Sequence, residues 1–445
     1  MRQNKINKWA LFLIGVFSMT QINVIGWIGI SELVLFVLAP LFCVQDWVLL
    51  RRHGFATILV LAILMFFGGL IANWMNNIPF RDAARGQASV YAIFAVIVGL
   101  HHFLWRNIDN MKWLLLGIAI SSVICTFVFQ PGFDRTSNAG GEILSGAEAM
   151  ENRMSYSLFW LAQFGSWTLL PIQTLYLSTP TLYIIFVMMF LIIYALIESG
   201  SRSGFGLLIV SLLLLLIGEK RQPSMLRIRR DFLLLCAGGF LVVGGITSAY
   251  KMAALHGYMG EAQLQKYEHQ SARGSDLLSL LMAGRTGFFA AFYAALDKPI
   301  VGHGAWALDY KGYYREFLEK YGTEEELDDY VKSDVGQGRS IDYLPGHSQI
   351  MNGWTSCGIF GLIFWCYILY GCFTTFKNNL AVVPQWYGYL CLALPTTLFA
   401  TLFSPFASRI PTVLIYVACL FVKAIRDGRM RLPEAMQMEV MKKAR

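Results

Sequence analysis

Charged side chains are scarce in this sequence. Lys, Arg, Asp and Glu make up 14% of the 445 residues, whereas hydrophobic residues make up 56%. A soluble domain carries about a quarter charged residues, which form its hydrated surface. A bilayer instead penalises a charge at mid-depth by roughly 2.5–3.5 kcal/mol. The shortage of charge therefore excludes an ordinary soluble enzyme and predicts an all-α polytopic membrane protein.

The signatures of several other protein classes are also missing. The sequence has no P-loop, no GxGxxG motif, no HExxH motif and no Cys/His zinc cluster. We therefore expect no ATP use, no bound metal and no cofactor. The eight cysteines fall in or beside apolar runs, which predicts small packing residues rather than a disulfide framework. The net charge of +8 does not indicate nucleic acid, because the basic residues lie in short segments between apolar runs.

The apolar runs predict about twelve membrane-spanning helices, each near the roughly 20 residues that cross a bilayer. The first run resembles a signal peptide but has no convincing small-residue cleavage site, so we expect an uncleaved first span. The predicted spans are 9–25, 29–49, 55–74, 87–105, 112–131, 155–173, 180–199, 203–218, 231–249, 349–372, 384–403 and 410–424.

The distribution of Lys and Arg predicts the orientation. With the N-terminus in the cytoplasm, basic residues concentrate in the inner segments, and twelve spans return the C-terminus to the same side. The inner segments hold Arg2, Lys5, Lys8, Arg51, Arg52, Arg106, Lys112, Lys220, Arg221, Arg227, Arg229, Arg230, Lys377 and the basic tail 425–445. The short outer segments hold only Arg81, Arg85, Arg135, Arg153, Arg202 and Arg409.

One outer segment is much longer than the others. Residues 250–348 separate a membrane domain at 1–249 from a second one at 349–424. The segment is mildly acidic, and we expect two helices in it, at Leu277–Leu296 and Tyr310–Val331. Connections longer than about 15 residues usually carry function.

Three residues in or beside outer segments are candidates for chemistry. Arg202 lies in a tight turn between two apolar runs, where it either anchors at the membrane surface or binds an anion such as a lipid phosphate. Arg285 is a lone cation in an otherwise apolar helix and must face water or a partner. His347 precedes a span, and is either structural or a proton acceptor near neutral pH.

The spacing around these residues resembles a known family. His347-Ser348, nine further residues, Gly358, two residues and Gly361 resemble the H[NSQ]x9Gxx[GTY] signature of the O-antigen ligase superfamily. Ser201-Arg202-Ser203-Gly204 is similar to its SRxx turn. Gly284-Arg285, followed by Pro299-Ile300-Val301-Gly302-His303-Gly304, is similar to its GR…PxxGxG segment. Many members have Asn after the histidine, where this chain has Ser348, so the acceptor preference is open.

The resemblance implies a GT-C-like fold and a bacterial inner-membrane enzyme whose site faces the periplasm. It implies an inverting, metal-independent transfer of a glycan from a polyprenyl diphosphate to an acceptor sugar hydroxyl, such as one on lipid A–core. Arg202 and Arg285 would stabilise the leaving diphosphate, and His347 would take or orient the acceptor proton.

Other activities stay open at this point. A polymerase of lipid-linked repeat units or a protein oligosaccharyltransferase would share the motifs. A flippase for lipid-linked sugar would instead need charged or broken spans near mid-membrane.

Several further residues are weaker candidates. Arg81 and Arg85 are four residues apart, so they would share one helix face and either bind diphosphate or anchor at the interface. His303 is a minor candidate for a direct role. Tryptophans at span ends either stack on sugars or belong to the interfacial aromatic belt; these are Trp306, Trp354 and Trp365. The remaining histidines of the first membrane domain are expected to be bystanders; these are His53, His101 and His102.

Overall fold

The computed structural model describes part of the chain, and within that part the protein is all-α apart from one short hairpin. Its ten α-helices are α1 (Arg2–Val16), α2 (Ile30–Arg52), α3 (Ala56–Met75), α4 (Phe80–Leu104), α5 (Met111–Phe127), α13 (Thr286–Asp297), α14 (Tyr313–Tyr321), α16 (Gln349–Asn378), α17 (Tyr387–Phe403) and α18 (Arg409–Arg426). A 3-10 turn, η1, covers Ile108–Asn110. The described residues are 2–23, 27–127, 189, 207–208, 210–211, 214, 252, 256, 258, 286–321, 330, 343–344, 348–378, 382–383, 386–403 and 409–431.

Four of the described helices, α2, α3, α4 and α16, are long and apolar enough to cross a membrane, and α17 is a shorter apolar helix. The chain is therefore a multi-pass membrane protein. The predicted spans 155–173 and 231–249 lie outside the described residues, and so does 180–199 apart from residue 189.

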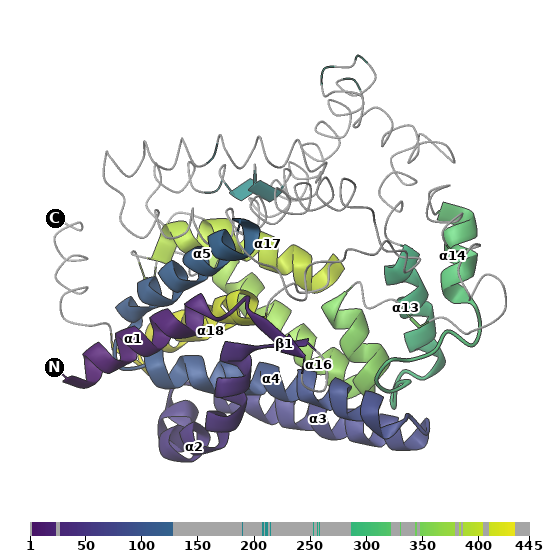
Figure 1. The fold of residues 1–445 in the computed structure, drawn as a ribbon, viewed down its shortest axis with the longest axis horizontal. Helices are drawn as coiled ribbons and strands as arrows, with labels where there is room; N and C mark the ends of the chain where they lie inside the picture. The colour runs from purple at the N-terminus through teal and green to yellow at the C-terminus, as the bar shows by residue number, and fades with distance from the viewer. Residues whose placement is uncertain are drawn as a thin grey trace.

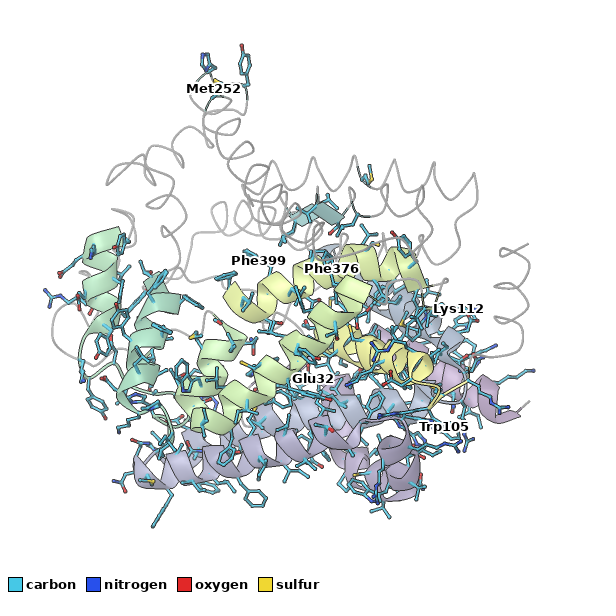
Figure 2. The ribbon with its side chains drawn as sticks, turned by 180° about the vertical axis from the view of Figure 1, so that it is seen from behind. Glu32, Trp105, Lys112, Met252, Phe376 and Phe399 are labelled. Carbon is cyan, nitrogen blue, oxygen red and sulfur yellow. The ribbon has the colours of Figure 1, made fainter. Side chains whose placement is uncertain are left out.

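The bundle has two ends, which we name by residues. The His53 end is where α2 meets α3, and the Asn76 end is where α3 meets α4. α3 runs from the His53 end to the Asn76 end, and α4 returns beside it. Figure 1 shows α13 and α14 on the right, at the Asn76 end, and the start of α1 on the left. Figure 2, seen from behind, places Trp105 and Lys112 at the end opposite α13.

Basic residues predicted to lie on the inner side share the His53 end. Arg51 and Arg52 end α2, and Lys112 lies in the first turn of α5. The Arg429 guanidinium lies so close to Gly54 that a Cβ there would be 2.8 Å from its Nη1. This clustering is what the predicted alternation of spans requires.

Small residues let two helices of the first domain approach closely. A Cβ added at Gly117 of α5 would lie 2.9 Å from the Gly15 Cα of α1. Without a hydrophobic driving force between helices in lipid, such close backbone packing is a main source of association. α1 and α5 are thereby held side by side.

The structure corrects two predicted helix boundaries. The prediction of one helix over 9–25 is wrong: α1 ends at Val16, and β1 (Gln21–Asn23) pairs antiparallel with β2 (Trp27–Gly29). Thr20 and Ile22 are β-branched residues, which favour extended backbone over helix. The helix predicted at 87–105 begins earlier, because Pro79 has an extended conformation suited to the start of α4 and Asp82 lies in the first turn.

The helix predicted over 349–372 is broken. α16 contains Gly358 with φ 62° and ψ −148°, so it consists of two limbs, 349–357 and 359–378. The two limbs pack closely against each other. A Cβ at Gly353 in the first limb would lie 2.6 Å from Trp365 Nε1 in the second. The second limb, about 30 Å long, is by itself long enough to cross a bilayer.

Candidate functional site

The three principal candidates, Arg202, Arg285 and His347, lie outside the described residues. The segments that flank them in sequence are described, and all three flanks contact α17. These contacts define the geometry of the candidate site.

The flank that follows Arg202 packs along α17. Ser211 Oγ donates a hydrogen bond to Leu392 O at 3.3 Å, and Tyr387 OH donates one to Leu214 O at 3.2 Å. Residue numbers rise along this flank as they fall along α17, so the two segments run antiparallel. Toward lower residue numbers, the flank runs toward the C-terminal end of α17.

The residues that follow Arg285 and His347 lie at that same end of α17. Thr286 is the first residue of α13, and Phe288 contacts Phe403 with ring centroids 5.5 Å apart. Ser348 Oγ lies 3.5 Å from Thr401 O and accepts a hydrogen bond from Met351 N at 3.3 Å, which caps the start of α16. The N-terminus of α16, with a partial positive charge that favours anions, therefore lies at the C-terminal end of α17.

The break in α16 joins two of the motif segments. A Cβ at Gly358 would overlap the Ile300 carbonyl and lie 2.6 Å from the Val301 carbonyl carbon. Ile359 N donates to Ile300 O at 3.0 Å, and a Cβ at Gly302 would lie 2.7 Å from Gly358 N. Only a residue without a side chain fits at Gly358 and Gly302, which accounts for glycine at both positions.

Side chains of α3 and α16 fix the loop that contains Gly302 from either side. Asn76 Nδ2 donates to Gly302 O at 3.1 Å, and Asn73 Oδ1 accepts from Ala305 N at 2.7 Å. From α16, Trp354 Nε1 donates to Pro299 O at 2.9 Å. Sequence reasoning missed both asparagines, although polar residues at the end of an apolar run are a visible signal.

His303 has a structural role in this loop. Its backbone N donates to Thr355 O at 2.6 Å, and its Nε2 lies 2.7 Å from Ala294 O and must donate, since a carbonyl only accepts. The ring thus ties the loop to α13.

An ion cluster ties the end of α13 to the start of α14. Asp297 accepts hydrogen bonds from Lys311 Nζ at 2.7 Å and Tyr313 OH at 2.9 Å. The Lys311 hydrogen bond lowers the pKa of the Asp297 carboxyl below its ordinary value. Helices are present in both regions where two were predicted, since α13 covers the second half of Leu277–Leu296 and α14 lies within Tyr310–Val331.

Arg81 and Arg85 both lie in the first turns of α4, at the Asn76 end. Arg85 lies 3.9 Å from Asp82 and stacks over the Trp306 ring, with Cζ 5.0 Å from its centroid. Arg81 is exposed. Their role in binding diphosphate stays a prediction.

A partly buried ion pair lies one helical turn further along α4 than Arg85. Arg409 Nη1 donates to Glu32 Oε2 at 2.7 Å, and its Nη2 donates to Ser89 Oγ at 2.9 Å. The Glu32 side chain is 4% exposed. Arg409 was expected only as an outer-side cation, and nothing in the sequence linked it to Glu32.

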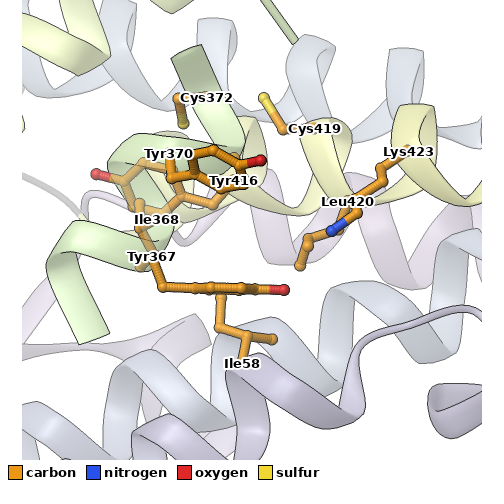
Figure 3. A pocket seen from close by; sticks show the side chains of 10 residues that line it. Ile58, Tyr367, Ile368, Tyr370, Cys372, Tyr416, Cys419, Leu420 and Lys423 are labelled. Atoms are coloured by element: carbon orange, nitrogen blue, oxygen red, sulfur yellow. The ribbon is translucent and has the colours of Figure 1, made fainter. Parts of the chain in front are cut away.

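A small apolar pocket lies elsewhere, near the His53 end between α3, α16 and α18 (Figure 3). Tyr367 and Lys423 line it, with Ile58 below the Tyr367 ring. Of the candidate residues that the structure describes, none lines this pocket, and it holds no more than water-sized molecules. It is a packing gap between helices rather than a substrate site.

The three expected bystander histidines form a polar cluster at the His53 end. His53 Nδ1 lies 3.1 Å from His101 Nε2, and His102 Nδ1 lies 2.7 Å from Asp46 Oδ2. Burial lowers the pKa of His53, and Arg52 lowers it further. The cluster lies far from α13, at the opposite end of the bundle.

No protein-family model matches the chain, and no curated protein sequence matches it. Within the described part of the chain, no three His, Cys, Asp or Glu side chains gather as metal ligands do.

Proposed function

We propose that this protein is a membrane glycosyltransferase of the O-antigen ligase type. It moves a glycan from a polyprenyl-diphosphate donor to a sugar hydroxyl of an acceptor, lipid A–core, at the periplasmic face of a bacterial inner membrane. The fold is GT-C-like, with about twelve spans and the helical segment 250–348 on the outer side.

The observation that carries the proposal is that three motif flanks pack against α17, two of them at its C-terminal end. Ser211 contacts α17 through Leu392, Ser348 lies beside Thr401, and Phe288 of α13 contacts Phe403. Three segments far apart in sequence thus share α17 as a common support, as segments that build one site do. The interlocked glycines Gly302 and Gly358 give the two later motifs a common rigid support.

The chemistry assigns a role to each candidate. The acceptor oxygen attacks the anomeric carbon, the bond to the diphosphate oxygen breaks, and the anomeric centre inverts. Arg202 and Arg285 stabilise the charge that builds on the diphosphate, and the N-terminus of α16 favours the same anion. His347 accepts or orients the proton of the attacking hydroxyl.

The composition of the membrane helices favours surface chemistry over passage. A flippase needs charged or broken spans lining a path across the bilayer. In the described residues, the break in α16 packs against residues 300–302 at the Asn76 end. The charges of Glu32 and Arg409 neutralise each other in an ion pair.

The acceptor separates the ligase from a polymerase. Deleting the gene for a ligase leaves lipid-linked polymer of normal length and bare lipid A–core. Deleting a polymerase leaves single repeat units. A knockout with single repeat units on lipid A–core would move the assignment to polymerase.

A further inference from the structure

We propose that Trp306, Arg85 and Tyr343 form a platform that binds a pyranose ring of the glycan. The proposal rests on the proposed function and names residues that the motifs do not contain. The ring belongs to either the donor glycan or the acceptor oligosaccharide, which share this chemistry.

The loop that contains Trp306 turns its largest side chain outward. Ala305 and Ala307 are 6% and 7% exposed, whereas Trp306 between them is 49% exposed. Trp306 also has φ 56°, a left-handed conformation that is rare for a bulky residue. Burial of apolar surface does not account for this arrangement, and strained residues of this kind cluster at functional sites.

The surrounding contacts hold the indole in place. Leu344 N donates to Ala307 O at 2.8 Å, and Leu308 pairs with Tyr343 in an isolated β-bridge. This bridge brings Tyr343, which is four residues before His347 in the chain, beside Trp306 with ring centroids 6.1 Å apart. The platform therefore joins the loop that contains Gly302 to the segment that precedes His347 in the chain.

The three side chains suit a sugar better than a lipid tail. The indole face carries negative potential and attracts the C–H face of a pyranose, as it attracts Arg85 on its covered side. Arg85 and the Tyr343 hydroxyl supply hydrogen-bonding groups near the indole, and a sugar has hydroxyls to pair with them. A lipid tail has no group that could hydrogen-bond with either side chain.

Binding is measured on the full chain in nanodiscs with two probes. One is delipidated core oligosaccharide, and the other is the polyprenyl-diphosphate-linked glycan. Trp306→Ala should weaken binding of at least one probe about tenfold, whereas Trp306→Phe, which keeps a flat ring, should stay within about threefold of wild type. Weaker binding of the core oligosaccharide assigns the bound pyranose ring to the acceptor. Weaker binding of the polyprenyl-diphosphate-linked glycan alone assigns it to the donor.

Trp74→Ala is the matched control. Trp74 is at the same end of the bundle, is 79% exposed, and has no aromatic or cation contact among the described residues. It should bind both probes as wild type does. If Trp306→Ala does not fold, Tyr343→Ala should weaken binding about threefold.

Unchanged affinity for both probes in the Trp306 or Tyr343 variant would overturn the proposal. Equal losses in Trp306→Ala and Trp74→Ala would also overturn it, because both would then be interfacial anchors. Binding is read without catalysis, so a chain that binds glycan but transfers none refutes the proposed function and leaves the platform standing.

Discussion

Gly358→Ala should strongly destabilise the protein. Its φ of 62° and ψ of −148° lie in a region that only glycine adopts readily, and forcing another residue there costs about 1–3 kcal/mol. The new methyl group would also overlap the Ile300 carbonyl, and such overpacking costs about 1–3 kcal/mol more. The expected loss in free energy of unfolding is therefore about 2–6 kcal/mol.

Gly371→Ala in the same helix is the matched control. A Cβ at Gly371 meets no atom within 4 Å, and the residue has ordinary helical backbone. Replacing glycine by alanine in a helix interior should stabilise by about 0.5–1 kcal/mol. Unfolding of both purified variants is followed by circular dichroism in detergent under increasing denaturant. Equal stability of the two variants would refute the account of the break in α16.

Three other outcomes follow from the described contacts. Arg409→Met should lower the free energy of unfolding by about 3 kcal/mol, because it leaves the Glu32 carboxylate buried without its partner. Adding Glu32→Gln should restore most of this loss in the same unfolding assay. Additive losses in the double variant would contradict the pairing. Burial lowers the pKa of His53 below its ordinary value of 6.5. Below pH 6.5 the unfolded chain therefore binds a proton at His53 that the folded chain does not bind. The free energy of unfolding should be constant above pH 6.5 and fall as the pH drops below it. Melting temperatures at pH 7.5 and 5.5 test this, and His53→Asn should reduce the difference. Asn73→Ala should slow glycan transfer without changing helix content, because it frees the Ala305 backbone near the site; unchanged transfer would assign Asn73 to packing alone.

Much of the membrane architecture was predictable from composition. α3 lies within one residue of its predicted range of 55–74, because a strongly apolar run ends at Asn76 and Asn77. α17 and α18 are similarly close to their predictions. Charge scarcity and run length carry this signal, and both are local properties.

The features that the sequence did not predict depend on contacts between distant segments. Gly358 in an apolar run looks like a helix-packing glycine, and its break is set by the approach of Ile300. The platform at Trp306 depends on Arg85 from α4, and the ion pair depends on Glu32 meeting Arg409. Apolar composition also does not separate a helix from a hairpin, which is why the end of α1 was misplaced.

The most direct test of the proposed function is transfer in a purified system. Wild-type protein, lipid-linked glycan donor and lipid A–core acceptor are incubated with and without EDTA, beside His347→Ala of equal thermal stability. The account predicts product with wild type, an unchanged rate with EDTA, and a rate about 10²–10³ lower for His347→Ala. No product with wild type, or a near-normal rate with His347→Ala, would contradict it.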